Sequence, residues 1–394
     1  MRISKIETLQ ADGGWRRFSF LKVSTDEGLV GWSEYAESYW SRGLGALIEA
    51  LAPSAIGEDP RRVGPLTARL HATTRLTAGG LTHQAIAAIE NACLDIKAKA
   101  LGVPVYALVG GPYRERLPLY WSHFGTFRAR YPEYFAQVGG TTQVRSLDDL
   151  QRLAREAVAR GYRALKANPL VFDGPAPRML DPGFGPRPTE FAQNFDARAW
   201  AQVDDQMAAL REAVGPECGL MLDLNFGLKP EGQLRAARLL ERHRLHWLEL
   251  DTTDPAALAQ VRAGAGTPVA SLESLHGRRA YRPFFDKGAV DVAIVDVPWN
   301  GFLESVKIAS MAEAYELNVA PHNFCGHLYT MINAHFAAAL PNLRIMEIEV
   351  DDVPWRDELF TTAPQVQDGE LVLSEAPGWG IEVNEEAVRS RPPR

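Results

Sequence analysis

Eight short apolar runs recur between residues 117 and 350 of this sequence, and amphipathic helical segments lie between them. The first run is LPLYWSH and the last is RIMEIEV, and a typical helical segment is EGQLRAARLLERHR. Eight strand–helix units in about 235 residues are typical of a (β/α)8 barrel of the TIM type. An open, doubly wound sheet is the alternative. The even spacing of the units and the lack of a glycine-rich dinucleotide-binding loop favour the barrel.

The regions on either side of this pattern are of a different kind. Residues 1–50 contain strand-like runs around a DEG turn signal, and residues 43–101 have apolar residues at helical spacing. The tail contains the strand and turn signals of DGELVLSEAPGWGIEV. We therefore predict an α+β capping domain over 1–115, a barrel over 116–355, and a C-terminal segment over 356–394 that returns to the capping domain.

The connection after the second apolar run is unusually long. Residues 169–198, rich in Pro, Gly and Phe, separate the run YRALKAN from the next helical segment. Connections of this length are uncommon and are usually functional or disordered. In a barrel, a connection that follows a strand lies on the face where active sites form. Two interpretations stay open: a lid over the substrate, or a surface excursion without a role in the reaction.

Charge and cysteine content restrict the partners and the compartment. The formal net charge is −7 and the basic residues are scattered, so we expect neither nucleic acid nor an anionic membrane as a partner. Cys93, Cys218 and Cys325 lie far apart without a CxxC pair, which favours a reducing compartment. The N-terminus lacks an apolar signal-peptide core, and no apolar run reaches membrane-spanning length. We therefore expect a cytoplasmic protein.

Three consecutive runs of the barrel pattern end in a carboxylate. Asp223, Glu249 and Glu273 follow one another at intervals of 26 and 24 residues. The strand ends of a TIM barrel meet at its active-site face, where three buried carboxylates would repel one another unless a divalent cation were bound. Ligation by oxygen alone, without paired Cys or His, favours Mg²⁺ over zinc. The alternative, in which each carboxylate caps the following helix, is less favoured for three strands in succession.

The next two runs end in Asp296 and His322. Neighbouring parallel strands lie about 5 Å apart, so these two side chains can form a hydrogen bond. A carboxylate behind an imidazole sets its tautomer and raises its basicity. Taken alone, His322 would be interpreted as structural, but beside three carboxylates it is predicted to be a general base.

Taken together, these features resemble the mandelate racemase subgroup of the enolase superfamily over almost the whole chain. The segments that carry the resemblance are TDEGLVGWSE, AIENACLDIKAKALGVPVYALVGG, DLN, LEL, LES, VDVAIVDVPWNGF, APHNFCG and APGWGIEV. The resemblance implies an N-terminal capping domain on a modified, (β/α)7β-like barrel. It also implies Mg²⁺ on the three carboxylates, and abstraction of the proton α to a substrate carboxylate to give an enediolate held by the metal. Even-numbered homo-oligomers, from dimer to octamer, are a further implication.

The sequence departs from this family at the second barrel strand. The family has a Lys-x-Lys there, whose second lysine is a base on the opposite face of the substrate, whereas this chain has Lys166 and Asn168. The resemblance implies that Lys166 helps to bind the substrate carboxylate. It also places Glu347 near the substrate, although a structural role is equally consistent. At the fourth strand, Leu250 replaces the usual second acidic residue, and Asp251 follows.

The loss of the second lysine bears on the reaction. Proton transfer between two faces of a substrate needs a base on each face, whereas dehydration needs one base and an acid for the leaving group. We therefore predict a lyase that dehydrates a small-molecule sugar acid to a 2-keto-3-deoxy acid. A racemase, epimerase or cycloisomerase on the same scaffold is the alternative. A catalytically idle family member is a third possibility, against which the intact metal and dyad residues argue.

The capping domain is expected to select the substrate. GGWRRF, with Trp15, Arg16 and Arg17, and TTRLTAGG, with Arg75, have neighbouring glycines and are candidates for mobile flaps. Arginine suits a second carboxylate or sugar hydroxyls. The same residues are equally consistent with an ordinary surface.

Overall fold

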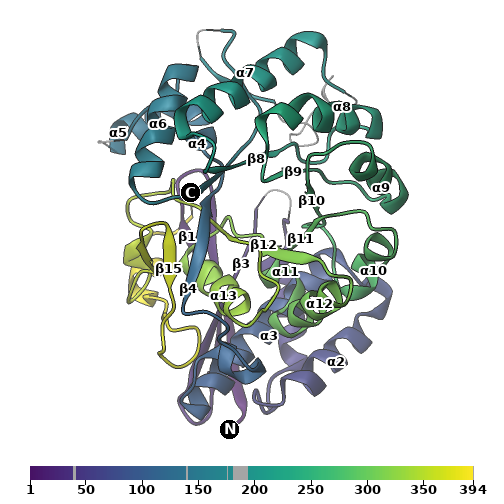
Figure 1. Ribbon diagram of the computed structural model, residues 1–394. Helices are drawn as coiled ribbons and strands as arrows, with labels where there is room; N and C mark the ends of the chain where they lie inside the picture. The colour runs from purple at the N-terminus through teal and green to yellow at the C-terminus, as the bar shows by residue number, and fades with distance from the viewer. Residues whose placement is uncertain (39–40, 139–140, 175, 181–193, 394) are drawn as a thin grey trace.

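The computed structural model describes residues 1–394 apart from 39–40, 139–140, 175, 181–193 and 394 (Figure 1). The N-terminal part is a three-stranded antiparallel sheet followed by helices. Its elements are β1 (Ile3–Asp12), β2 (Arg17–Thr25), β3 (Val30–Tyr35), α1 (Leu44–Leu51), α2 (Val63–Thr73) and α3 (Gly80–Leu101). Most of the circumference of α3 is buried, because this helix lies between the N-terminal sheet and helices of the following part.

Eight parallel strands of the described residues form the second part. They are β4 (Arg116–Trp121), β5 (Ala164–Ala167), β8 (Gly219–Asp223), β9 (Trp247–Glu249), β10 (Val269–Ser271), β11 (Val292–Val295), β12 (Asn318–Pro321) and β13 (Met346–Ile348). Seven of them follow one another from β4 to β12 in chain order, and β13 pairs with β4. Between β12 and β13 the ladder is reduced to one bridge, from Val319 to Leu343. The strands therefore curve round into a barrel that closes between β12 and β13 through this bridge.

Helices surround this barrel (Figure 1). They are α6 (Leu147–Ala159), α7 (Ala197–Val214), α8 (Pro230–Leu240), α9 (Pro255–Ala263), α10 (Arg278–Asp286), α12 (Phe302–Ala314) and α13 (His327–Ala338). Three short helices lie near strand ends: α4 (Thr126–Arg130), α5 (Pro132–Val138) and α11 (Val297–Asn300). Among the described helices, none has the length and apolarity needed to cross a bilayer.

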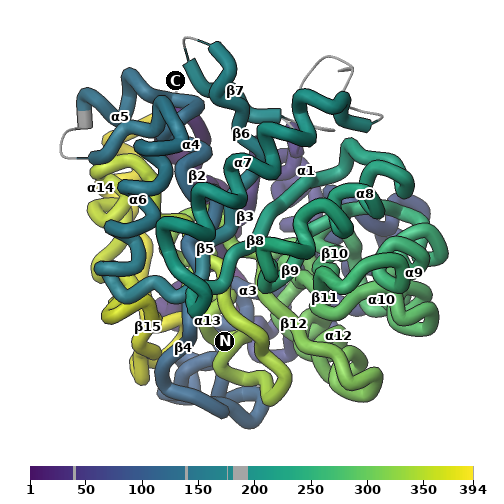
Figure 2. The backbone as a smooth tube through the Cα atoms, turned by 45° about the horizontal axis from the view of Figure 1, so that its top comes forward, coloured from purple at the N-terminus to yellow at the C-terminus, as the bar shows by residue number. Residues whose placement is uncertain are grey.

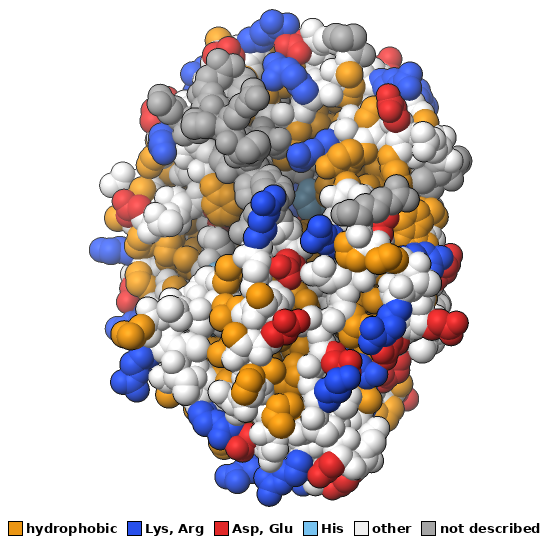
Figure 3. Space-filling model, turned by 180° about the vertical axis from the view of Figure 1, so that it is seen from behind, with side chains coloured by type: hydrophobic (Ala, Val, Ile, Leu, Met, Phe, Trp, Pro, Cys, Tyr) orange, Lys and Arg blue, Asp and Glu red, His pale blue; other side chains and the backbone are white. Residues whose placement is uncertain are grey.

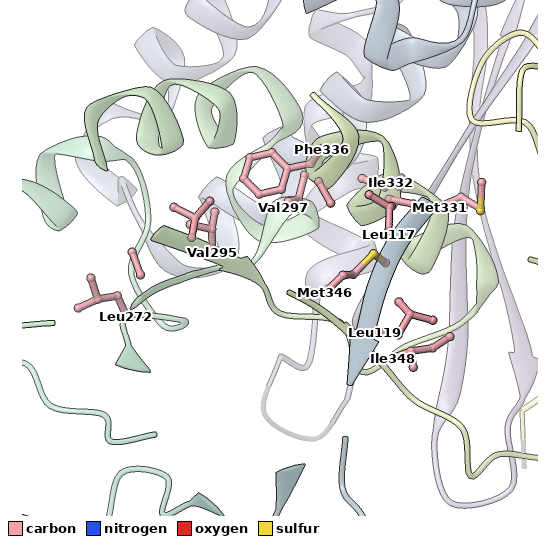
Figure 4. Close-up of a cluster of buried hydrophobic side chains, with 14 of the residues drawn as sticks. Leu117, Leu119, Leu272, Val295, Val297, Met331, Ile332, Phe336, Met346 and Ile348 are labelled. Carbon is pink, nitrogen blue, oxygen red and sulfur yellow. The ribbon is translucent and has the colours of Figure 1, made fainter. Parts of the chain in front are cut away.

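Side chains along each barrel strand point alternately into the barrel and out toward the helices, and they form two apolar layers. Side chains that point into the barrel form one buried cluster, which includes Tyr120, Met221, Trp247 and Ile294. Their neighbours along the strands point outward against the helices, as expected for a period of two. Figure 4 shows this outer layer where side chains of β4 and β13 meet those of α13; its labelled members there are Leu117, Leu119, Met346, Ile348, Met331, Ile332 and Phe336. A filled interior leaves the strand ends as the place for a site.

The N-terminal part contacts the barrel close to the end of β12. Glu34 on β3 accepts hydrogen bonds from the backbone N–H groups of Gly326 (2.7 Å) and Tyr329 (2.9 Å), at the start of α13. A carboxylate at a helix N-terminus is stabilising because it satisfies free N–H groups and faces the positive end of the helix dipole. Burial nevertheless raises the pKa of Glu34 to about 7. This contact joins β3 to the segment that carries His322.

The C-terminal segment contains β14 (Gln365–Gln367), β15 (Glu370–Val372) and α14 (Glu385–Arg389). Antiparallel pairing of β15 with β4 brings it alongside the barrel (Figure 2). Further along, the backbone N–H of Trp379 donates to Asp95 on α3 (3.0 Å), and its indole N–H donates to the carbonyl of Trp32 on β3 (3.1 Å). The segment therefore contacts both preceding parts. The boundaries at residues 115 and 355 remain a prediction.

Only the two ends of the long connection 169–198 can be described. β6 (Leu170–Val171) pairs with β7 (Arg178–Met179) in a small antiparallel ladder. Residues 181–193, in the middle of this connection, lie outside the described residues.

Candidate active site

The strand ends bring the predicted site residues to one end of the barrel. Each lies in a barrel strand or within two residues of its end, and each side chain is buried; they are Lys166, Asn168, Asp223, Glu249, Glu273, Asp296, His322 and Glu347. The backbone is left-handed at Asn225 (φ 52°) and Leu272 (φ 95°), beside two of the carboxylates. Non-glycine residues in this region are uncommon and concentrate where a site constrains the chain.

The predicted metal ligands lie on the β8–β10 side. Asp223 and Glu249 are register partners on β8 and β9, so their side chains project next to each other. Glu249 Oε2 accepts from the Trp247 indole N–H (3.0 Å) and lies 3.0 Å from Lys166 Nζ. Glu249 Oε1 is buried and has no hydrogen-bond partner among the described residues. An acceptor without a partner in a buried carboxylate cluster fits a cation ligand.

Electrostatics in this cluster also favour a cation. Burial raises the pKa of Glu273 well above its usual range, and the neighbouring carboxylates raise it further. Burial and nearby Glu249 raise the pKa of Asp251 to about 7. Among the described residues, no group of three acidic, histidine or cysteine side chains has the geometry of a formed metal site. Instead, Lys166 Nζ lies 3.7 Å from Asp223 and 3.0 Å from Glu249. The unpartnered Glu249 Oε1 and the all-oxygen donor set nevertheless fit Mg²⁺, with Asp223, Glu249 and Glu273 as the residues that could hold it.

Glu347 on β13 has the opposite environment. Its carboxylate lies 3.1 Å from Lys166 Nζ and accepts hydrogen bonds from the Ser122 hydroxyl and from the Asn323 backbone N–H (2.7 Å). Burial acts to raise the pKa of Glu347, but Lys166 and other nearby groups lower it to about 2. Lys166 in turn has a pKa well above its usual range: burial acts to lower it, and Glu249 and Glu347 outweigh that effect. The ammonium group is therefore held charged between the two sides of the site.

The predicted dyad is formed on β11 and β12. His322 Nδ1 lies 2.8 Å from Asp296 Oδ2, and the same oxygen accepts from the Tyr329 hydroxyl (2.5 Å). The other oxygen of Asp296 accepts from the Trp299 backbone N–H (2.8 Å), so the carboxylate is held at both ends. Since Nδ1 is engaged, Nε2 is the nitrogen available for proton transfer, and it lies 3.5 Å from Glu273 Oε2.

Neighbouring groups also set the basicity of His322. Burial acts to lower the pKa of His322, but Glu273 and Asp296 outweigh it and raise the value to about 10. A cation on Glu273 would remove part of this effect and bring the pKa closer to the range of a working base. The ring of Phe324 stacks on the imidazole, with centroids 4.8 Å apart.

Asn168, at the predicted position of the missing lysine, is held by its neighbours. Its amide oxygen accepts from the Thr126 hydroxyl (3.1 Å), and its backbone carbonyl accepts from the Gln206 amide (3.0 Å). An amide has no useful basicity. This position therefore offers hydrogen bonds and no base.

Several groups at the site are absent from the sequence prediction. Ser122 and His123 end the first apolar run, LPLYWSH, and the strand-end rule that found the carboxylates would have found them too. Tyr329 is different, because it lies on a helix and meets Asp296 only through folding. No spacing in the sequence indicates that contact.

Two of the four cap residues proposed as flaps, Trp15 and Arg16, are engaged in contacts within the protein. Arg16 is partly buried and its guanidinium bonds to the Phe324 carbonyl and to Asp352, so a free substrate-binding role for Arg16 is not supported. Trp15 packs among Phe127, Tyr131, Tyr134 and Phe135. Arg17 and Arg75 are exposed. On the face shown in Figure 3, basic, acidic and apolar side chains are interspersed, and a histidine surface is visible in a hollow near the centre.

Comparison with protein families identifies the class of protein. A family model described as enolase C-terminal domain-like matches residues 149–387, and the N-terminal domain model of mandelate racemase / muconate lactonizing enzyme matches residues 10–110. The chain therefore belongs to the mandelate racemase / muconate lactonizing enzyme family of the enolase superfamily. The predicted resemblance and the predicted fold class, a TIM-type barrel with an N-terminal capping domain, are confirmed.

Individual relatives extend over nearly the whole chain. A D-xylonate dehydratase of Haloferax volcanii is 29% identical over 394 residues, which is 98% of this chain and 88% of the relative. A D-galactonate dehydratase of Xanthomonas euvesicatoria pv. vesicatoria is 28% identical over 411 residues, covering 99% of this chain and 94% of the relative. A crystal structure described as a "putative L-alanine-DL-glutamate epimerase" from Burkholderia xenovorans strain LB400 is 45% identical, with a TM-score of 0.96 and coverage of 100% and 99% of the two chains. A second structure of that protein, bound to magnesium and fumarate, has a TM-score of 0.95 at 45% identity, with coverage of 100% and 96%.

Proposed function

We propose that this protein is a hydro-lyase that removes water from a sugar acid to give a 2-keto-3-deoxy acid. The observation that carries the proposal is the one-sidedness of the site. An imidazole with a carboxylate partner lies at the end of β12, and an amide held by Thr126 lies at the end of β5. Such a site abstracts one proton, and at position 168, where a lysine would return it from the other face, it has an amide. The dehydratases among the relatives support the same reaction class.

His322 is the base in this proposal. Asp296 and Tyr329 fix the imidazole so that Nε2 takes the proton from the carbon α to the substrate carboxylate, which leaves an enediolate. Lys166 binds the substrate carboxylate, and Glu347 keeps the ammonium group charged and oriented. Asn168 positions the substrate on the opposite face. The buried surroundings exclude water, which strengthens each of these interactions.

Asp223, Glu249 and Glu273 would hold Mg²⁺. When bound, the ion stabilises negative charge on the substrate carboxylate as the proton leaves. The magnesium-bound neighbour structure supports this choice of metal for the family fold. A small-molecule carboxylate is then the partner that the site takes.

An isomerase, such as an epimerase, is the second candidate, because the neighbour at 45% identity is described as an epimerase. The two functions differ in the fate of the proton. A dehydratase forms a 2-keto product, and any deuterium that enters unreacted substrate in D₂O has retained configuration at C2. An epimerase, racemase or cycloisomerase forms no such product, and an epimerase fills the pool with the inverted isomer.

The test is a screen with Mg²⁺ in D₂O, using D-xylonate, D-galactonate, a panel of other aldonates, and L-Ala-D-Glu and L-Ala-L-Glu. Formation of a 2-keto acid from an aldonate supports the proposal, and NMR of the remaining substrate gives the configuration at C2. Epimerised dipeptide with no reaction of any aldonate would overturn it in favour of the second candidate.

Compartment and assembly complete the proposal. We place the enzyme in the cytoplasm, because all three cysteines are buried and free. We expect a homo-oligomer between a dimer and an octamer, with neither nucleic acid nor membrane as a partner. Light scattering on the purified protein measures its molar mass in solution and so tests the expected homo-oligomer.

A further inference from the structure

A second histidine–carboxylate pair lies at the ends of β4 and β13. It is at the same end of the barrel as the candidate active site, which we call the barrel mouth. His123 Nδ1 lies 2.7 Å from Oε2 of Glu349, one residue beyond β13. Glu349 is buried, and burial raises its pKa while His123 opposes that effect. The His123 backbone is left-handed (φ 46°), an uncommon conformation for a residue with a side chain. The backbone thus turns at His123.

This pair is built like the dyad of the proposed base. In both, Nδ1 faces a buried carboxylate, at 2.7 Å for His123 and 2.8 Å for His322. In both, a phenylalanine stacks on the ring with centroids 4.8 Å apart: Phe127 on His123 and Phe324 on His322. Each imidazole therefore has one nitrogen held and the other left for a reaction.

His123 differs from a purely structural histidine such as His335 in the solvent exposure of its side chain and in its free ring nitrogen. His335 is buried and both of its ring nitrogens are bonded, one to the Tyr106 N–H and one to the Trp379 carbonyl. The side chain of His123 is 23% exposed, and its Nε2 has no hydrogen-bond partner among the described residues. The free nitrogen is therefore accessible to a ligand.

Neighbouring contacts place His123 beside the substrate-binding groups. The preceding residue, Ser122, bonds to Glu347, and the N–H of the following residue, Phe124, donates to the Lys166 carbonyl (2.8 Å). Phe127, which stacks on His123, also contacts Trp15 of the cap loop, with centroids 5.4 Å apart. His123 thus lies between the strand that carries Lys166 and the cap loop, and we take the carbons beyond C2 of a bound aldonate to extend toward its imidazole.

We propose that His123 is the general acid that protonates the departing β-hydroxyl; this inference rests on the dehydratase function proposed above. His322 takes the C2 proton, and the electron pair of that bond moves into the substrate carboxylate to give the enediolate. In a second step this electron pair returns to form the C2=C3 double bond as the C3–O bond breaks. The Nε2–H of the His123 imidazolium gives its proton to the leaving oxygen, and water departs. The resulting enol becomes the 2-keto acid by gaining a proton at C3 and losing its O–H proton to solvent. No oxidant or reductant is required.

The experiment separates proton abstraction from loss of the hydroxyl. His123→Asn and His123→Gln are assayed with Mg²⁺ in D₂O on an aldonate that the native enzyme dehydrates, such as D-xylonate or D-galactonate. Formation of 2-keto acid should fall by about 10²–10⁴-fold, the usual contribution of a general acid. Exchange of the C2 proton should stay within a few-fold of the native rate. On the 3-deoxy-3-fluoro analogue both variants should eliminate at near-native rates, because fluoride needs less protonation than hydroxide.

Two controls make the result decisive. His243→Asn removes an imidazole from another histidine–carboxylate pair, with Asp204, which lies away from the barrel mouth; its activity should be unchanged. Thermal unfolding shows whether each variant is folded. Equal loss of exchange and dehydration in folded His123 variants, or no loss of either, would overturn the assignment. If the native enzyme dehydrates no aldonate, the proposed function itself fails, which is a different outcome.

Discussion

Glu347 and Glu273 are both buried glutamates at the barrel mouth, and their environments are opposite. Glu347 has an ammonium group, a hydroxyl and a backbone N–H as partners, and its pKa is held at about 2. Glu273 has His322 at 3.5 Å and other carboxylates nearby, and burial raises its pKa well above the usual range. The chain itself supplies the positive charge on the β13 side. On the β8–β10 side Lys166 also faces Asp223 and Glu249, whereas Glu273 has the His322 imidazole as its one basic partner among the described residues.

This difference indicates what each side does. A carboxylate that is fully hydrogen-bonded and paired with lysine stabilises the arrangement of a binding site. Carboxylates without such partners cost folding free energy and persist at sites where a ligand compensates them. We therefore expect changes on the two sides to differ in both activity and stability.

Replacement of a metal ligand should give the largest effect. Asp223→Asn is expected to weaken Mg²⁺ binding and to abolish turnover, while the fold is retained because the residue lies outside the apolar core. Isothermal titration calorimetry with Mg²⁺ and an aldonate assay measure the two effects. Asp291→Asn, which removes a carboxylate paired with Arg262 away from the mouth, is the matched control. Unchanged Mg²⁺ affinity in Asp223→Asn would refute the ligand assignment.

Loss of the base should be nearly as severe. His322→Asn is expected to lower kcat by about 10²–10⁴-fold, and to abolish C2 exchange as well as product formation. Asp296→Asn should cause a smaller loss, because it disturbs the tautomer and basicity of an imidazole that remains in place. Steady-state kinetics and exchange in D₂O test both. Near-native rates in the two variants would show that the dyad is misassigned.

Replacement of Glu347 and replacement of Glu273 should change the free energy of unfolding in opposite directions. In metal-free protein at pH 8, Glu347→Gln should destabilise by about 3 kcal/mol, because it removes one partner of a buried pair while Lys166 retains Glu249. Glu273→Gln should instead stabilise, because a carboxylate whose pKa is raised by burial no longer has to ionise. Urea unfolding in EDTA measures both.

The pH dependence of these two effects follows from the pKa shifts. The folded pKa of Glu347 lies below its unfolded value, so its contribution to stability is present above about pH 4.5 and is lost as the pH falls towards 2. For Glu273 the shift is reversed, and the penalty grows as the pH rises above the unfolded pKa. Effects of the same sign for the two variants at pH 8 would contradict the comparison.

Much of the fold was predictable because local patterns repeat. Eight apolar runs at regular spacing predict the barrel, and carboxylates that end successive runs predict which side chains gather at its mouth. Pairings between distant elements were not predictable. The Tyr329 contact with Asp296 and the pairing of Arg16 with Asp352 depend on how a helix and a cap loop pack, and no periodicity encodes that. Ser122 and His123 were predictable in principle, since they obey the strand-end rule.

Glu90 on α3 is a buried carboxylate away from the barrel mouth. Its replacement should change the free energy of unfolding least among the substitutions considered. It accepts the Leu303 N–H at 2.9 Å, and burial raises its pKa to about 7. The folded pKa lies above the unfolded value of about 4.5. The loss of stability from ionising Glu90 is therefore absent below pH 4.5 and complete above pH 7. Glu90→Gln keeps the acceptor oxygen and removes the charge. It should therefore raise the free energy of unfolding by about 1–2 kcal/mol at pH 8 and by little at pH 5, with activity unchanged. Urea unfolding at the two pH values is the measurement. An equal change at both would mean that packing or hydrogen bonding, and not the buried charge, determines the effect at this position.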